Sequence, residues 1–301
     1  MRILVTGGAG FVGSNIAKRL ESKDGGGHEV VVLDNFYSGD FRNLVGFHGE
    51  VVSGDCTEEP IGGPFQAIFH EASITDTTVV DQYFMMGNNV EGFRNVLGWA
   101  AKWNARVVWA SSAATYGNLP APNRITDVCQ PLNVYGYSKL AMERMAARWA
   151  KSTGQTIVGL RYFNVYGPGE GHKGKFASMI YQLAQQMKAG KRPRVFKFGE
   201  QKRDFVSVED VLQANLLALK AEWSGVYNVG CGRAGTFNEV IAGLNAALGT
   251  KLEADYFDNP YDFFQNHTEA DISQTAKALG YQPRFVQVAD GIQHYHASGA
   301  L

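Results

Sequence analysis

Tyr135 and Lys139 are the residues of this sequence whose types and spacing most directly suggest chemistry. They are four positions apart in YGYSK, residues 135–139, so on a helix they share one face. A phenol with a pKa near ~10 is a poor base at neutral pH, but a neighbouring ammonium stabilises the phenolate and lowers that pKa. The same pair also occurs on many helices where the tyrosine packs and the lysine is solvated, so the context must decide.

Ser112 supplies a hydroxyl in a position that suits the pair. The apolar run at residues 106–110 predicts a buried strand, which delivers residues 111–117 to the carboxyl edge of a sheet. Open α/β folds bind their ligands at this edge. Ser112 could hold a substrate oxygen there while Tyr135 moves the proton, which favours the catalytic interpretation of the pair.

A glycine-rich turn near the start predicts a dinucleotide site. It follows the apolar run at residues 3–5 and opens an amphipathic segment, which reads as strand, turn and helix. The spacing G-x-x-G-x-x-G lets a pyrophosphate approach the backbone and face the free N–H groups of the helix. Glycines serve a purely structural turn equally well. The candidate cofactor-binding residues of this turn are Gly7, Gly10, Phe11, Val12 and Gly13.

The strand expected at residues 29–33 ends at Asp34, 21 residues past the last glycine of the turn (34 − 13 = 21). A carboxylate there is expected to accept hydrogen bonds from the adenosine ribose, with Asn35 beside it. Past the next strand, Asp55 is placed to meet the adenine edge, and Cys56 adjoins it. Asp34 favours NAD, while Arg42 keeps NADP open because a 2′-phosphate would need a nearby cation.

Apolar strands alternate with helical patterns along the first half of the chain, which predicts an α/β fold with a doubly wound parallel (Rossmann) sheet. Further strands are expected at residues 50–54, 66–70 and 157–163, and a helix at 89–103. Helices at 177–189, 208–220 and 236–248, with a strand at 225–229, predict a smaller mixed lobe. We expect a dinucleotide-binding domain over residues 1–165 and a lobe over 166–301, with some segments returning to the first domain.

The composition excludes several classes of binding partner and several locations. Lys and Arg total 28 against 29 Asp and Glu, so neither nucleic acid nor an anionic membrane is indicated. About eighteen consecutive apolar residues occur nowhere, and the N-terminal apolar run is too short for a signal peptide. Cys56, Cys129 and Cys231 have no metal or disulfide spacing and are interpreted as reduced packing residues. A cytoplasmic protein is expected, with a flexible connection over residues 21–28.

These segments together resemble the extended short-chain dehydrogenase/reductase family, the nucleotide-sugar epimerases and dehydratases. The resemblance spans essentially the whole chain. It implies catalytic roles for Ser112, Tyr135 and Lys139, permanently held NAD(P), and a C-terminal lobe that binds the nucleotide of a nucleotide-sugar. The segments are TGGAGFVG (6–13), DNFYSG (34–39), SSAATYG (111–117), YGYSK (135–139), RYFNVYGPG (161–169) and KRDFVSVEDV (202–211).

Three features bear on the subfamily. Dehydratases of this family carry Asp and Glu where this chain has Ala113 and Ala114. The stretch EGHKG at residues 170–174 resembles the ADP-glyceromanno-heptose 6-epimerases, which implies that Lys173 is a second acid/base and that His172 adjoins the substrate. Residues 264–271 resemble the same subfamily. The chain departs from this subfamily at Gly169, where an arginine is expected, and at Ser207, where a tyrosine is expected. The region around Asp34 resembles NAD-binding relatives more than the NADP-binding heptose epimerases.

Asn164 and Arg203 complete the expected substrate site. Asn164 could hydrogen-bond the sugar or a phosphate, and Arg203 could bind the diphosphate through its planar fork. Arg203 could instead form a surface salt bridge, and Lys173 could be an exposed loop lysine. The helices at 89–103 and 136–151 lie where relatives associate, so a homo-oligomer is expected. The alternatives are a UDP-hexose 4-epimerase and a catalytically silent dinucleotide sensor.

Overall fold

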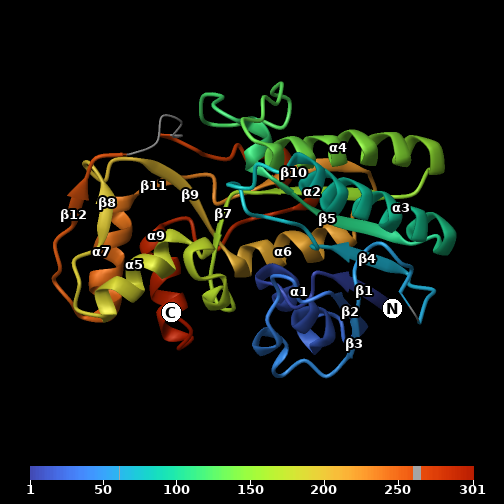
Figure 1. Cartoon of the computed structure of the whole chain (residues 1–301), viewed down its shortest axis with the longest axis horizontal. Helices are drawn as coiled ribbons and strands as arrows, with labels where there is room; N and C mark the ends of the chain where they lie inside the picture. Colours follow the sequence, from blue (N-terminus) through green and yellow to red (C-terminus); the bar gives the residue numbers. More distant parts are fainter. Residues whose placement is uncertain (61, 260–265) are drawn as a thin grey trace.

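Seven parallel strands form the central sheet of the structure, a computed structural model that describes residues 1–60, 62–259 and 266–301. Their order is β10-β6-β5-β4-β1-β2-β3 (Figure 1). The order reverses between β4 and β1, and open α/β sheets bind their ligands at the carboxyl ends of the strands at such a point. The predicted doubly wound α/β sheet is confirmed. The strands are β1 (Arg2–Thr6), β2 (Glu29–Asp34), β3 (Glu50–Ser53), β4 (Ala67–His70), β5 (Arg106–Ser112), β6 (Ile157–Tyr162) and β10 (Gly225–Val229).

Helices cover both faces of this sheet, which explains why its strands are apolar runs rather than alternating patterns. On one face α1 (Phe11–Glu21), α6 (Val208–Leu219) and α8 (Ser273–Leu279) bury a cluster that includes Ile16 and Val211. On the other face α3 (Gly92–Trp103) and α4 (Val134–Thr153) bury a cluster that includes Phe93, Trp109 and Met142. The glycine turn and the Tyr135 helix therefore belong to opposite faces of the sheet.

The helix expected at residues 89–103 is the C-terminal part of a longer helical segment, of which α3 covers residues 92–103. This helix α3 is preceded by α2 (Gln82–Met86), capped by Asp81, whose Oδ1 accepts the Phe84 N–H at 2.9 Å, and by a π turn, η3 (Gly87–Glu91). Asn89 in this turn is wholly buried and donates to the Ser138 hydroxyl at 3.0 Å. The hydrogen bond from Asn89 to Ser138 joins this π turn to α4, the helix that carries Tyr135 and Lys139. Such turns are frequent at functional sites.

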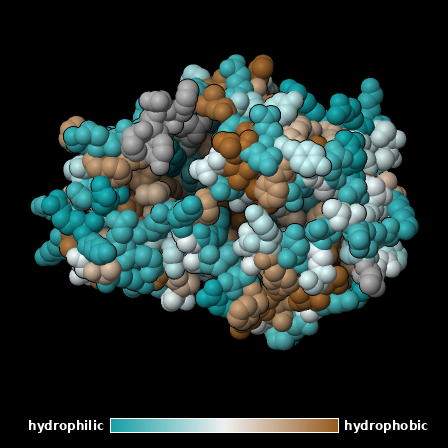
Figure 2. Space-filling model, viewed as in Figure 1, coloured by the Kyte–Doolittle hydropathy of each residue, from teal (hydrophilic) through white to brown (hydrophobic). Residues whose placement is uncertain are grey.

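A second group of elements packs beside the sheet, at the left in Figure 1. Its core includes Tyr166, Ile180, Val240 and Ile292. Figure 2 shows the surface hollowed where this group meets the main sheet. The group contains a three-stranded sheet, β11 (Ala234–Thr236), β9 (Lys202–Ser207) and β7 (Asn164–Tyr166), a pair, β12 (Asp255–Phe257) and β8 (Arg194–Phe196), and helices α5 (Met179–Lys188), α7 (Phe237–Leu248) and α9 (Val288–Ala297).

Two expectations about this half of the chain need correction. The strand at 225–229 does not belong to the smaller lobe; as β10 it pairs in parallel with β6 at the edge of the main sheet. The helix at 208–220, here α6, also packs on the main sheet, against β5, β6 and α1. Of the resembling segment 264–271, Phe264 and Gln265 lie outside the described residues.

Two findings on the described residues concern other kinds of site. None of their helices is both long and apolar enough to cross a bilayer. They also contain no grouping of three His, Cys, Asp or Glu side chains suited to a metal ion. Cys56, Cys129 and Cys231 are free thiols.

Candidate active site

The glycine turn has the shape that a pyrophosphate requires. Gly7 has a φ of +68° and donates its N–H to the Leu33 carbonyl at 2.8 Å, which joins the turn to β2. A Cβ on Gly13 would lie 2.2 Å from the Gly7 carbonyl oxygen, and one on Gly10 would lie 3.1 Å from it. Phe11 is buried and begins α1, followed by Val12 in the first turn. The N–H groups of that turn are available to an anion.

Asp34 lies at the end of β2 with its carboxylate fixed by the backbone. Its Oδ2 accepts the Ala9 N–H and its Oδ1 accepts the Phe36 N–H, both at 2.8 Å. A carboxylate held in this way keeps lone pairs for ribose hydroxyls. The neighbouring Asn35 is exposed, and its Oδ1 accepts the Tyr37 N–H at 3.0 Å. The turn and Asp34 thus fit a dinucleotide.

Asp55 and Cys56 follow β3, on the far side of β2. Asp55 is exposed, and its Oδ1 accepts the Thr57 N–H at 2.7 Å. Cys56 is buried, and burial raises the pKa of its thiol to about 12. A thiol in this environment is a packing group. The contact of these two residues with adenine stays a prediction.

Ser112, Tyr135 and Lys139 are brought together at the carboxyl end of β5. The Tyr135 phenol hydrogen-bonds the Ser112 hydroxyl. The Lys139 side chain is 2% exposed; its Nζ donates to the Ala110 carbonyl at 2.8 Å and lies 5.9 Å from the centroid of the Tyr135 ring. Asn133 caps α4 by accepting the Gly136 N–H at 2.8 Å, which starts the helix just before the pair.

The protonation of this group differs from the sequence expectation. Burial raises the pKa of Tyr135, although its hydrogen bond to Ser112 lowers it, so the phenol is protonated at neutral pH. Burial also lowers the pKa of Lys139 to about 8, against the opposing effect of Glu71 and Glu143. Burial and the nearby Glu71 hold the pKa of Tyr135 above its ordinary value, whereas the sequence led us to expect Lys139 to lower it.

Glu71 is a titratable residue at the site that the sequence analysis missed. It follows β4 at the point where the sheet order reverses, and its Oε1 accepts the Tyr162 hydroxyl at 3.1 Å. Asn215 donates to the same hydroxyl at 2.9 Å. Burial raises the pKa of Glu71 to about 8, while Lys139 lowers it. An isolated charge directly after an apolar strand was the available signal.

A buried ion pair supports the catalytic strand and helix from behind. Arg161 donates to both carboxylate oxygens of Glu143, at 2.8 and 2.7 Å, and Ser111 donates to the same carboxylate at 2.6 Å. Glu143 lies one helical turn after Lys139, and Ser111 precedes Ser112. The Glu143 carboxylate, bound by Arg161 and Ser111, therefore fixes α4 relative to the end of β5.

Lys173 lies against the start of α1. Its segment, η5 (Gly171–Phe176), is attached to the cofactor side by the Asn15 amide, which donates to the Pro168 carbonyl at 2.8 Å. His172 Nδ1 lies 3.1 Å from the Asn43 amide nitrogen and 2.9 Å from the Gly169 carbonyl. The Lys173 ammonium is 5.9 Å from the centroid of the Phe11 ring, and burial lowers its pKa, while Glu170 raises it.

Asn164 and Arg203 lie on neighbouring strands of the three-stranded sheet, β7 and β9. Asn164 is exposed, and its Oδ1 lies 3.5 Å from the Thr268 hydroxyl. One Arg203 nitrogen donates to the Lys202 carbonyl at 2.9 Å, and burial lowers the guanidinium pKa to about 10. The structure therefore brings the two expected anchors to one sheet, on the side of the C-terminal group.

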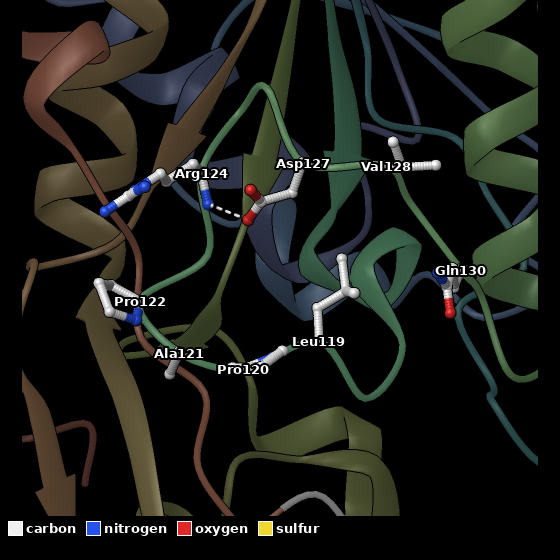
Figure 3. Close-up of a pocket in the computed structure, with 8 residues that line it drawn as sticks. All are labelled: Leu119, Pro120, Ala121, Pro122, Arg124, Asp127, Val128 and Gln130. Atoms are coloured by element: carbon white, nitrogen blue, oxygen red, sulfur yellow. Dashed lines mark hydrogen bonds between the residues drawn. The ribbon is translucent and has the colours of Figure 1, made fainter.

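A surface hollow of about 380 Å³ lies apart from these residues, in the loop after β5. Its lining includes Leu119, Pro122 and Val128 and none of the candidate catalytic residues. Figure 3 shows the Arg124 backbone N–H donating to the Asp127 carboxylate, at 2.7 Å. This contact closes the loop on itself, and we assign the hollow no role.

A parallel sheet with a glycine turn after its first strand and a carboxylate at the end of its second defines the class of dinucleotide-binding proteins, to which this chain belongs. More particularly, the chain belongs to the NAD dependent epimerase/dehydratase family, whose model matches residues 3–230. Because this family is NAD-dependent, NAD is favoured over NADP as the cofactor of this chain.

Solved structures agree with this family over nearly the whole chain. The ADP-L-glycero-D-manno-heptose-6-epimerase of Helicobacter pylori is 44% identical, with a TM-score of 0.91 over 99% of this chain and 95% of that one. The UDP-glucose 4-epimerase of Thermotoga maritima with UDP-glucose is 28% identical, with a TM-score of 0.89 over 99% and 98%. The protein MoeE5 in complex with UDP-glucose and NAD is 27% identical, with a TM-score of 0.83 over 99% and 98%.

Proposed function

We propose that this protein is an ADP-glyceromanno-heptose 6-epimerase, which inverts the exocyclic carbinol carbon of a nucleotide-linked heptose. The observation that carries this proposal is the position of Lys173 on the cofactor side, against α1, while Tyr135 lies on α4 across the sheet. Two acid/base groups on opposite sides of the substrate would make this inversion simple, because one could remove the hydroxyl proton and the other could return a proton after the carbonyl has turned over. The likeness to the Helicobacter pylori enzyme supports the same substrate.

NAD held by the glycine turn and Asp34 would supply the reversible hydride transfer by which the carbinol carbon is oxidised and then reduced again. Lys173 and Tyr135 would each carry out one of the two proton transfers. Lys173 would remove the hydroxyl proton, and burial lowers the pKa of its ammonium, while Glu170 raises it. Burial raises the pKa of Tyr135, which keeps its phenol protonated as the opposing acid. Ser112 holds the substrate oxygen beside Tyr135, and Lys139 stabilises the phenolate once the proton has left.

Substrate anchoring is assigned to the C-terminal group of elements. Arg203 would bind the diphosphate, while Asn164 and His172 would bind the sugar or a phosphate. We assign residues 1–165 to the NAD-binding domain and residues 166–301 mainly to the nucleotide-sugar lobe, with α6, β10 and α8 returning to the first domain. A cytoplasmic homo-oligomer fits the three free thiols and the helices α3 and α4.

The experiment is an NMR assay of the purified protein with ADP-D-glycero-β-D-manno-heptose and no added cofactor, with UDP-galactose in parallel. Inversion of the heptose alone supports the proposal. Conversion of UDP-galactose alone would make the protein a UDP-hexose 4-epimerase and Lys173 a bystander. Bound NAD without turnover of either compound would favour the sensor.

A further inference from the structure

Asp40 is a second carboxylate beside the expected ribose position. Its N–H donates to the Ala9 carbonyl at 3.0 Å, and the N–H of the same Ala9 donates to Asp34 at 2.8 Å. Gly39 lies so close that a Cβ on it would be 2.9 Å from Asp34 Oδ1. The two carboxylates therefore flank one short piece of backbone at the end of β2.

Asp40 also engages the cation that would recognise a 2′-phosphate. The Arg42 Nε lies 2.9 and 3.1 Å from the two Asp40 oxygens, and its Nη2 donates to Oδ2. The Arg42 backbone N–H donates to Oδ1 at 2.8 Å, because Asp40 caps the 3₁₀ turn η2 (Phe41–Leu44). The contacts with Arg42 lower the pKa of Asp40 to about 2, so its charge persists at every physiological pH.

The pairing costs little to maintain. Asp40 is only 15% exposed in its side chain and is fixed by the turn, so the arginine alone has to be ordered. Arg42, 71% exposed, would have to give up this fork to bind a phosphate. A 2′-phosphate entering here would also meet two carboxylates, Asp34 and Asp40, whereas a ribose hydroxyl can donate to a carboxylate.

We propose that Asp40 makes the cofactor site selective for NAD over NADP, by holding Arg42 away and by placing a second negative charge beside Asp34. The proposal rests on the assignment of Asp34 to the adenosine ribose. It does not depend on which sugar the enzyme epimerises, since it concerns cofactor binding alone.

The test measures bound nucleotide rather than activity. Purified protein is incubated with equimolar NAD⁺ and NADP⁺ until the bound ratio is constant, free nucleotide is removed, and bound nucleotide is quantified by chromatography. Asp40→Asn keeps an oxygen that can cap η2 but removes the charge. Asp271→Asn is the matched control, because Asp271 Oδ1 likewise accepts an N–H two residues on, from Ser273 at 2.9 Å, and the carboxylate pairs with Arg124.

The wild type is expected to hold mainly NAD. Asp40→Asn should raise the NADP-to-NAD ratio about fivefold, the effect of one nearby charge in water. Asp40→Asn with Arg42→Ala should keep only part of that gain, because the repelling carboxylate is still absent but Arg42 can no longer bind the phosphate. Retained total nucleotide shows that the site is folded. An unchanged ratio in Asp40→Asn, an equal rise in Asp271→Asn, or an undiminished rise in the double variant would overturn the proposal.

Discussion

Gly13→Ala is the substitution that most sharply tests the shape of the cofactor turn. A Cβ at Gly13 would lie 2.2 Å from the Gly7 carbonyl oxygen, 2.9 Å from the Gly7 carbonyl carbon and 3.0 Å from the Gly8 Cα. All three are backbone atoms, which cannot rotate out of the way. Gly98 is the matched control, because it is also helical, in α3, and a Cβ there would meet nothing within 4 Å.

The magnitudes follow from these contacts. Replacing glycine by alanine inside a helix gains about 0.8–1.0 kcal/mol, which Gly98→Ala should show in full. Gly13→Ala should gain no more than this and lose about 1–3 kcal/mol to overpacking. The free energy of unfolding should therefore differ between the variants by about 1–3 kcal/mol. The displaced turn should also lower the affinity for NAD.

The assay is urea unfolding of both variants with excess NAD, together with the NAD content of each purified protein. Excess cofactor is needed because lost binding lowers the apparent stability by itself. If Gly13→Ala proves as stable as Gly98→Ala and retains its full NAD content, the account of the turn is refuted.

Three further predictions concern the catalytic group and its support. Tyr135→Phe and Lys173→Ala should each reduce turnover by about 10²–10⁴, the contribution of a general acid or base. Lys175→Ala, in the same turn η5 but exposed, should stay near wild type; a near-wild-type Lys173→Ala would rule out the second acid/base. Glu143→Gln should lower the free energy of unfolding by about 3–5 kcal/mol, because it leaves the buried Arg161 without its carboxylate. The control Glu91→Gln, in an exposed pair with Arg94, should change it by under about 1 kcal/mol. Thermal denaturation of both variants measures the difference. Turnover should fall as the pH rises through about 8, where Lys139 loses its proton. Between that pH and 10.5, the ordinary pKa of a lysine, the unfolded chain binds a proton that the folded chain has lost, so the contribution of Lys139 to stability should rise with pH. Comparing unfolding of wild type and Lys139→Met from pH 7 to 10 checks the sign, and a difference independent of pH would contradict it.

The sequence predicted the main sheet because its inner strands, such as β1, β2 and β4, are apolar runs buried on both faces. It could not assign the strand at 225–229 to a sheet, since its pattern does not say which neighbour it pairs with, and the structure places it beside β6. Residues 21–28 were expected to be a flexible connection. They contain the turn η1 (Lys23–Gly25), where a Cβ on Gly25 would lie 1.6 Å from the Arg19 carbonyl, so that glycine packs closely against the end of α1.

The candidate site was predictable where its residues share one local pattern. The glycine turn, Asp34 and the pair Tyr135 and Lys139 have characteristic spacings. The sequence marks Glu71 only as a charge directly after an apolar strand, and its role could not be inferred because it depends on Tyr162, 91 residues further along the chain. The pKa of Tyr135 could not be inferred either, since it depends on burial that only the fold supplies.

The measurement that tests the central claim most directly is epimerisation of ADP-D-glycero-β-D-manno-heptose in D₂O, followed by NMR at the inverted carbon. If inversion proceeds by oxidation and reduction at bound NAD, the hydrogen on that carbon never exchanges with solvent, because Lys173 and Tyr135 handle only the proton on oxygen. We therefore predict product with hydrogen, and no deuterium, at the inverted carbon. Deuterium at that position would show that the C–H proton is lost to solvent and would contradict the account.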